Sequence, residues 1–224
     1  MPDCCGVDYD EHFNAEDARR DLLDYRANGA QGSTRRLLDV LIREGVESAT
    51  LLDIGGGVGI VQLELLSAGA ASSLDVDASG PFIAVARAEA EERGFANRTD
   101  YRHGDFVALA PEVPPADVVT LDRVICCYPD VAGLVGRSAE RAKRLYGLVY
   151  PVDRWWTRAV ARVLNLVTRL TGGDYRMHVH DAGQVDRLIR SAGLEPRYHH
   201  AGMVWQTAVY GRVSSAEPTA QAAS

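Results

Sequence analysis

Residues 51–59 have the sequence Leu51-Leu52-Asp53-Ile54-Gly55-Gly56-Gly57-Val58-Gly59, and this stretch decides the fold. A short apolar run, Thr50–Ile54, leads into the glycines, which is typical of a buried parallel strand. Residues 60–68 then have helical spacing that ends at Gly69. A glycine loop between a strand and a helix is the setting of nucleotide-binding sites, because glycine allows positive φ and close approach of a ligand.

Strands and helices alternate along most of the chain. Further strands are predicted at 73–76, 99–103, 117–121, 145–149, 195–201 and 203–212. Helices are predicted at 13–28, 33–45, 81–93, 131–144, 153–170 and 182–192. Strands separated by helices predict an α/β protein with a parallel sheet covered on both faces. The last two strands follow each other directly, which predicts an antiparallel pair.

The composition excludes several classes of protein. With 224 residues, 46% of them hydrophobic and 25% charged, the chain is neither disordered nor collagen-like. Its net charge of −7 argues against a nucleic-acid binder, which needs a basic surface. The sequence shows no signal peptide and no run of about 18 apolar residues. We therefore expect a soluble, cytoplasmic protein whose four cysteines, Cys4-Cys5 and Cys126-Cys127, are free thiols.

A second acidic position supports a nucleotide-like ligand. Asp77 ends the next predicted strand, 22 residues after Gly55. From there a carboxylate can accept hydrogen bonds from ribose hydroxyls. A nicotinamide-binding loop would have the pattern G-x-G-x-x-G, but Ile60 occupies the place of its last glycine. The spacing found is D-x-G-x-G-x-G, so a dehydrogenase is the less favoured interpretation.

Over residues 50–212 the sequence resembles the class I S-adenosylmethionine-dependent methyltransferases. Four segments carry the resemblance: the loop 51–59, the strand end Asp75–Ser79, Gly104-Asp105-Phe106 after the third strand, and Val119–Arg123 at the fourth. The paired C-terminal strands also match this family. More distantly, the sequence is similar to the magnesium-protoporphyrin O-methyltransferases. The resemblance implies a Rossmann-like three-layer sandwich with a seven-stranded, mostly parallel sheet whose last strand is antiparallel.

The resemblance also implies the cofactor, S-adenosylmethionine, and the residues that bind it. These are Asp53, Gly55, Gly56, Gly57, Gly59, Asp77, Ala78, Ser79, Gly104, Asp105, Phe106, Asp122 and Arg123. Gly104-Asp105-Phe106 would contact adenine, and Asp122 would face the amino-acid end of the cofactor. The charge of Asp53 fits this cofactor, because an acidic residue suits an ammonium or sulfonium group and would repel a pyrophosphate.

The acceptor is expected outside the carboxyl end of the fourth strand, near the segment 122–130. Tyr128 and the thiols of Cys126 and Cys127 are candidates for shaping its pocket, although small buried cysteines are the commoner finding. Candidate catalytic residues are Tyr128 and, as general bases, His178 and His180. The two histidines equally fit local hydrogen bonding or capping of the helix at 182–192.

The predicted helix at 153–170 has Arg154, Arg158 and Arg162 in one basic stripe beside apolar residues. An ordinary packed helix with a solvated arginine face is the favoured interpretation. The alternatives are a lid over an apolar or anionic substrate and an interfacial helix on anionic lipid. The stripe indicates an acceptor that is acidic or apolar, and peripheral membrane contact is the less favoured possibility.

Three segments are predicted: an N-terminal helical cap at 1–46, the methyltransferase domain at 47–213 with its helical insertion at about 153–172, and a disordered tail at 214–224. Adjacent cysteines do not have zinc-site spacing, so we expect no metal. The sequence thus predicts methyl transfer from S-adenosylmethionine to a small-molecule acceptor, with oxygen as the favoured methylated atom. The alternative is a non-catalytic regulatory protein that binds S-adenosylmethionine or S-adenosylhomocysteine.

Overall fold

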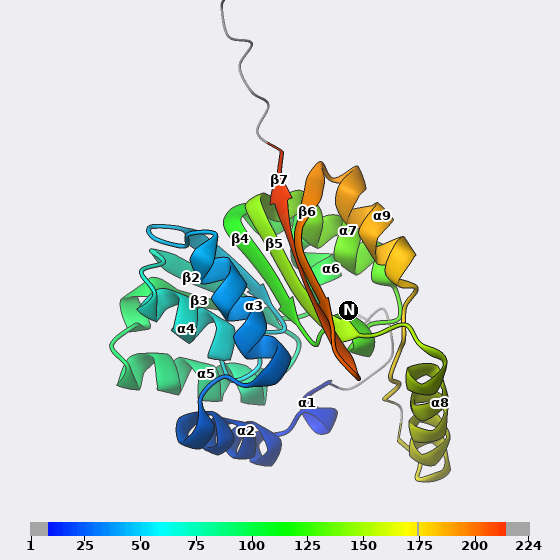
Figure 1. The fold of residues 1–224 in the computed structure, drawn as a ribbon. Coiled ribbons are helices and arrows are strands. Elements are labelled where there is room, and N and C mark those ends of the chain that lie inside the picture. The colour runs from blue at the N-terminus through cyan, green and yellow to red at the C-terminus, as the bar shows by residue number, and fades with distance from the viewer. Residues whose placement is uncertain (1–8, 174, 214–224) are drawn as a thin grey trace, which may run out of the picture.

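The computed structural model describes residues 9–173 and 175–213 (Figure 1). The predictions for Cys4-Cys5 and for the tail 214–224 lie outside the described residues. Seven strands form one sheet in the order β3-β2-β1-β4-β5-β7-β6. All neighbours are parallel except that β7 runs antiparallel to both β5 and β6. The predicted α/β class, the seven strands and the antiparallel last strand are therefore confirmed.

The strands and helices follow the predicted alternation. The strands are β1 Thr50–Ile54, β2 Ser72–Asp77, β3 Thr99–His103, β4 Ala116–Asp122, β5 Ala142–Pro151, β6 Leu194–Ala201 and β7 Trp205–Arg212. The α-helices are α1 Tyr9–His12, α2 Ala15–Asn28, α3 Gly32–Arg43, α4 Ile60–Ser67, α5 Gly80–Glu92, α6 Phe106–Leu109, α7 Val131–Arg141, α8 Trp155–Leu170 and α9 Ala182–Ser191. Short 3₁₀ turns lie at Ala96–Arg98, Ala110–Glu112 and Ile125–Cys127.

Two apolar cores lie on opposite faces of the sheet, because successive strand residues point to opposite sides. On β1, Leu51 belongs to the core that contains α3 and α4, whereas Leu52 and Ile54 belong to the core that contains α7 and α9. Tyr146 of β5 is fully buried in the second core, where its hydroxyl bonds Ser138 at 2.8 Å. The result is the three-layer sandwich seen in Figure 1.

The strand order reverses between β1 and β4. β1 pairs with β2 on one side and with β4 on the other, and Asp53 is in register with Asp75 and Thr120. At such a switch point the loops leave the sheet in opposite directions and open a crevice beyond the carboxyl ends of the strands. The glycine loop, the end of β2 and the end of β4 all meet at this edge.

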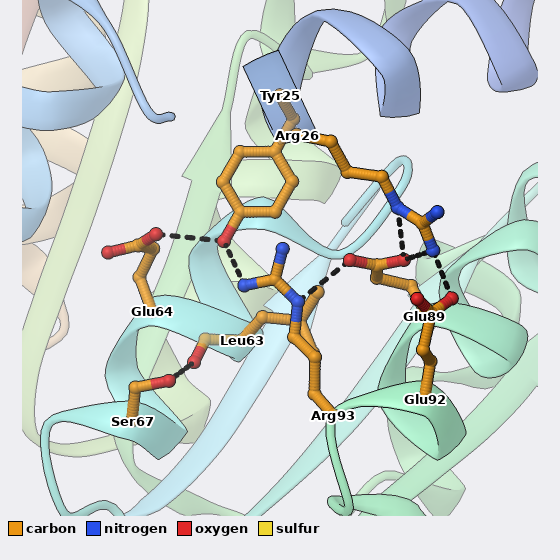
Figure 2. Close-up of polar contacts among 8 residues, drawn as sticks. All are labelled: Tyr25, Arg26, Leu63, Glu64, Ser67, Glu89, Glu92 and Arg93. Carbon is orange, nitrogen blue, oxygen red and sulfur yellow. Dashed lines mark hydrogen bonds and ion pairs between the residues drawn. The ribbon is translucent and has the colours of Figure 1, made fainter. Parts of the chain in front are cut away.

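Helix α2 is held against the sheet's outer helices by a polar network (Figure 2). The Glu89 carboxylate, 3% exposed, accepts hydrogen bonds from Arg26 Nε at 2.9 Å and Arg93 Nε at 2.7 Å. The Tyr25 hydroxyl donates to Glu64 Oε1 at 2.8 Å and accepts from Arg93. Residues of α2, α4 and α5 are thereby joined over the edge of the molecule next to the glycine loop.

Several predicted boundaries differ from those in the structure, and the reason is identifiable for two of the helices. The predicted helix at 13–28 starts later, at Ala15, because the Asn14 side chain caps it by accepting from Glu16 and Asp17 N–H. The predicted helix at 131–144 ends at Arg141. From Ala142 onward the chain pairs with β4, so sheet pairing overrides helical propensity there.

Helix α8 departs from the packed helix that the sequence favoured. Most of its apolar side chains are exposed, and only Thr157 and Ala161 are buried. None of the helices in the described part of the chain is long and apolar enough to span a membrane.

Candidate functional site

A cavity of about 460 Å³ opens at the carboxyl ends of β1, β2, β3 and β4. Its lining combines the glycine loop, the strand ends and the N-terminal segment. The residues around it are Tyr9, Asp10, Phe13, Asp21, Ile54, Gly55, Gly57, Val76, Asp77, Ala78, Ser79, Phe82, His103, Gly104, Asp105, Phe106, Asp122, Arg123, Val124, Cys127, Tyr128 and Leu134. The volume suits a ligand of cofactor size.

The glycine loop is shaped by positions that only glycine fills easily. Gly55 and Gly57 have φ of 64° and 59°, in the left-handed region. A Cβ at Gly55 would lie 2.7 Å from a methyl carbon of Val124, so any side chain there would have to displace the Val124 side chain. The loop therefore brings bare backbone to the cavity wall, as close approach of a ligand requires.

Asp77 lies at the end of β2 with its carboxylate fixed by the backbone. Gly57 N–H donates to Oδ2 at 3.0 Å, and Ser79 N–H donates to Oδ1 at 2.8 Å. Burial raises the pKa of this carboxyl above its usual range, while these hydrogen bonds oppose the shift. Each oxygen has a second lone pair, so the group is preorganised to accept hydroxyl donors from the cavity.

Beside the cavity lies a recess of about 240 Å³ lined by four carboxylates: Asp21, Asp24, Asp53 and Asp122. Thr120 donates to Asp53 Oδ1 at 2.7 Å, and Thr34 donates to Asp122 Oδ2 at 2.6 Å. The second oxygens, Asp53 Oδ2 and Asp122 Oδ1, are buried without a hydrogen-bond partner among the described residues.

Burial raises the pKa of Asp53 to about 7, and the charges of Asp122 and Asp77 add to the shift. Burial also raises the pKa of Asp122, although Thr34 and Arg123 oppose it. Two buried carboxylates with raised pKa values, each with one oxygen that accepts no hydrogen bond, fit a cationic ligand, because a positive charge would compensate for the hydration lost on burial. An S-adenosylmethionine ammonium group meets that requirement, so the residues fit the cofactor.

The end of β4 has a strained backbone. Arg123, which follows it directly, has φ of 63°, a conformation that L-residues other than glycine adopt rarely. Its N–H donates to the Val149 carbonyl at 2.9 Å, and its guanidinium lies 3.8 Å from Asp122 and over the Trp205 ring. These contacts of the backbone and the side chain hold Arg123 in its strained conformation, with its guanidinium group at the cavity wall.

The predicted catalytic residues occupy different places. The Tyr128 hydroxyl lies in the cavity wall and donates to Asp105, 3.0 Å from each carboxylate oxygen. His178 and His180 do not line the cavity. His180 Nε2 lies 2.8 Å from the Ile125 carbonyl and 3.0 Å from that of Tyr128, so it carries a proton that these carbonyls share. His178 has its pKa lowered by burial and by the nearby His180.

The structure brings most of the predicted cofactor residues together. Around the cavity or the recess lie Asp53, Gly55, Gly56, Gly57, Asp77, Ala78, Ser79, Gly104, Asp105, Phe106, Asp122 and Arg123. Gly59 lines neither; it has φ of 85° and starts α4. Its role is to turn the chain from the loop into the helix.

The sequence predicted an N-terminal helical cap but not which of its residues line the cavity. Tyr9, Asp10 and Phe13 line the cavity, and Asp10 Oδ1 accepts from Gly80 N–H at 2.7 Å. The spacing of the aromatic residues Tyr9 and Phe13 was the available signal in the sequence. Nothing in the neighbouring residues shows that these side chains line a cavity at the end of β2. His103 was also missed; its Nε2 lies 3.0 Å from the Ala78 carbonyl at the cavity wall.

Helix α1 contacts the segment that follows α8. The Tyr175 ring stacks on His12 with centroids 3.9 Å apart, and its hydroxyl lies 3.0 Å from Cys127 Sγ. Cys127 lines the cavity, whereas Cys126 is buried behind it, with 3.7 Å between the two sulfurs. Of this cysteine pair, only Cys127 therefore lines the cavity.

Comparisons with known proteins show which proteins this chain is similar to. Residues 52–150 match the family model of a methyltransferase domain. A search of the curated proteins found no match. Among solved structures, a magnesium protoporphyrin IX methyltransferase from Synechocystis with bound S-adenosylhomocysteine is similar, with a TM-score of 0.67 and 18% identity over 91% of this chain and 97% of that one.

Two further solved structures are similar over most of this chain. One is an O-methyltransferase family protein from Burkholderia thailandensis, with a TM-score of 0.64 and 18% identity over 81% of this chain and 56% of that one. The other is an O-methyltransferase family 2 protein from Planctomyces limnophilus in complex with apigenin, with a TM-score of 0.62 and 17% identity over 89% of this chain and 62% of that one. Residues 52–150 therefore match a methyltransferase domain, and the fold of the chain is similar to that of solved methyltransferases.

Proposed function

We propose that the protein transfers the methyl group of S-adenosylmethionine to an oxygen of a small-molecule acceptor. The observation that carries the proposal is the cavity at the β1/β4 switch point, where the predicted cofactor residues meet an aromatic and apolar wall. When bound, the cofactor supplies a methyl group activated by its sulfonium. The protein's part is to align donor and acceptor and to exclude water.

Different residues of the chain bind different parts of the cofactor. Asp77 accepts hydrogen bonds from the ribose hydroxyls, with its carboxylate held by Gly57 and Ser79. Asp105, fixed by Tyr128, and Phe106 form the adenine side. The oxygens of Asp53 and Asp122 that accept no hydrogen bond bind the ammonium group, since both carboxylates line the recess beside the glycine loop.

The acceptor lies against Phe13, Cys127 and Leu134, which offer an apolar surface. Arg123 supplies a cation at the same cavity and suits a carboxylate on the acceptor. An apolar molecule with a carboxyl or hydroxyl group fits both features. The O-methyltransferases among the similar structures support oxygen as the methylated atom.

Neither His178 nor His180 lines the cavity, and the Nε2 of His180 is occupied by two backbone carbonyls. The role we propose for His180 is to position the turn that carries Cys127 and Tyr128. Tyr128 remains a candidate for contact with the reacting groups, through its place in the wall. A carboxylate acceptor needs no general base, because its oxygen already bears the charge that attacks the methyl carbon.

The test has two stages. A thermal-shift screen compares S-adenosylmethionine, S-adenosylhomocysteine, NAD and NADP; stabilisation by the first two is expected, and stabilisation by NAD alone would contradict the family-based cofactor. The protein is then incubated with methyl-labelled S-adenosylmethionine and a small-molecule extract. Label in an organic fraction that is lost on mild alkaline hydrolysis indicates a methyl ester. Cofactor binding without any transfer would instead support the regulatory alternative.

A further inference from the structure

Helix α8 presents its apolar side to solvent. Figure 1 shows it apart from the sheet and the other helices, beyond the end of β5. Trp155 and Leu170, at its two ends, are each 77% exposed, and Val163 and Leu166 between them are 60% and 57% exposed. The exposed large apolar residues of the helix are Trp155, Val160, Val163, Leu164, Leu166, Val167 and Leu170.

The polar side of α8 faces the protein. Thr157 is buried and bonds the Val152 carbonyl at 2.5 Å. Asn165 exchanges two hydrogen bonds with the backbone of Met177, at 2.9 and 2.7 Å. Surface helices of globular proteins normally bury the apolar stripe and expose the polar one. Here the orientation is reversed and is fixed by specific hydrogen bonds, so the exposure of the apolar side is built into the fold.

The loop between β6 and β7 extends the apolar surface. Met203 is 80% exposed and Val204 43% exposed. The Trp156 indole N–H donates to the Met203 carbonyl at 3.3 Å, which holds this loop against the start of α8. A contiguous apolar surface from two separate elements marks an interaction site rather than a scatter of single exposed side chains.

The charges around α8 point to an anionic partner. Arg154, Arg158, Arg162 and Arg169 are exposed along the helix, and residues 154–170 contain no aspartate or glutamate. This concentration of positive charge stands in a chain whose net charge is −7. A second copy pairing through α8 would bring the two sets of arginines together, which disfavours that occupant.

We propose that α8, with Met203 and Val204, is a docking surface for an anionic lipid bilayer. A helix with an apolar face, flanking arginines and tryptophans lies in the plane of the membrane interface. At 16 residues α8 is about 24 Å long, and it lies along the surface rather than across it. Arg154, Arg162 and Arg169 contact lipid phosphates, whereas Arg158 is paired with Asp153; Trp155 and the aliphatic side chains enter the acyl boundary.

The test is flotation of the full-length protein with vesicles. Vesicles of phosphatidylcholine with about one-third phosphatidylglycerol are compared with vesicles of phosphatidylcholine alone, at low and high salt. The protein is expected to float with the anionic vesicles, and high salt is expected to weaken that binding. A blue shift of tryptophan emission that Trp155→Phe reduces is expected to accompany binding.

Matched variants separate the apolar from the charged contribution. Val163→Glu with Leu166→Glu is expected to abolish flotation, whereas Leu23→Glu, at a 66% exposed position on α2, is not. Arg162→Gln and Arg169→Gln are each expected to weaken binding to anionic vesicles about fivefold. Arg36→Gln, an exposed arginine of α3, makes the same charge change away from α8 and is expected to have no such effect. Unchanged thermal stabilisation by S-adenosylmethionine confirms that each variant is folded.

Two results would overturn the proposal. One is wild-type protein that does not float with anionic vesicles, or floats equally well after the double glutamate substitution. The other is protein that does not bind vesicles but sediments as a dimer that the same substitution dissociates, since a second copy would then cover this face.

Discussion

Asp77 holds each carboxylate oxygen at hydrogen-bond distance from a backbone N–H, and it does so at the wall of the cavity. Because the carboxylate is already held in place, its hydrogen bonds to a ligand cost little conformational entropy. Asp77→Ala is therefore expected to weaken S-adenosylmethionine binding about 10- to 100-fold, the range for a hydrogen bond to a charged group. Isothermal titration calorimetry measures the change. Asp100→Ala, an exposed residue of β3, is the control, and equal affinities for both variants would remove Asp77 from the site.

Asp53 gives the ligand-free protein a pH dependence of known sign. Burial raises its pKa in the folded protein to about 7, against about 3.9 in an unfolded chain. The stabilising contribution of the bound proton is present below pH 4 and is lost as the pH rises through 7. The Asn side chain of Asp53→Asn cannot titrate. We therefore expect the Tm of this variant to fall less than the Tm of wild type between pH 5 and pH 8.

The pH experiment is run without cofactor, by thermal denaturation at intervals of one pH unit. The expected difference in slope reaches at most about 1.4 kcal/mol per pH unit, the contribution of one proton. Parallel curves for wild type and Asp53→Asn would show that this carboxyl titrates in its ordinary range. Asp39→Asn, an exposed carboxyl of α3, controls for the loss of a surface charge.

At the level of elements, Glu89 of α5 ties helix α2 to the domain (Figure 2). Its buried carboxylate lies between the guanidinium groups of Arg26 and Arg93, which are 40% and 32% exposed. Glu89→Gln leaves both guanidinium groups without their common anion. We expect the free energy of unfolding to fall by about 1–3 kcal/mol, measured by urea denaturation at pH 7.

Glu92 provides a matched comparison on the same helix. It also pairs with Arg26, but its side chain is 65% exposed. Exposed ion pairs contribute little, so Glu92→Gln is expected to cost less than about 0.5 kcal/mol. Similar losses in the two variants would show that burial of Glu89 adds nothing to its pairing.

The elements that sequence could predict are those whose local pattern agrees with their packing. The apolar run of β1, the glycines after it and Asp77 at the end of β2 specify their own geometry, so the centre of the fold could be predicted from the sequence, whereas the predicted cofactor residues came from the family resemblance. The start of β5 at Ala142 did not, because its pairing partner in β4 lies more than twenty residues earlier. Periodicity also identified α8 as amphipathic but not which side faces solvent, since Asn165 finds its partner only at Met177.

The position of the two histidines could not be predicted from the sequence either. His178 and His180 alternate as a pair that faces one side of an extended segment, and their rings do stack, 5.7 Å apart. That side turns out to be the carbonyls of Ile125 and Tyr128 rather than the cavity. Which groups a side chain meets depends on how residues 175–181 pack against the turn at Ile125–Cys127, which no local spacing specifies.

For the molecule as a whole, the N-terminal segment and the sheet edge enclose the cavity from opposite sides. Tyr9 and Asp10 of α1, Phe13 after it and Asp21 of α2 line it on one side, whereas the glycine loop and the strand ends line it from the domain. A ligand that fills the cavity therefore contacts both parts, and opening of the N-terminal segment would sacrifice those contacts. Cofactor binding should stabilise this segment more than any element that does not touch the cavity.

Hydrogen–deuterium exchange measures that difference directly. At S-adenosylmethionine 100 times above Kd, binding adds about 2.7 kcal/mol to any opening that abolishes it, which slows exchange about 100-fold. We expect such protection in residues 9–28, in contrast to α8, which does not line the cavity and should exchange at the same rate with and without cofactor. Equal protection of both segments would indicate a global change in stability. Protection of neither, under conditions where calorimetry shows saturation, would mean that α1 and α2 do not close over the bound cofactor.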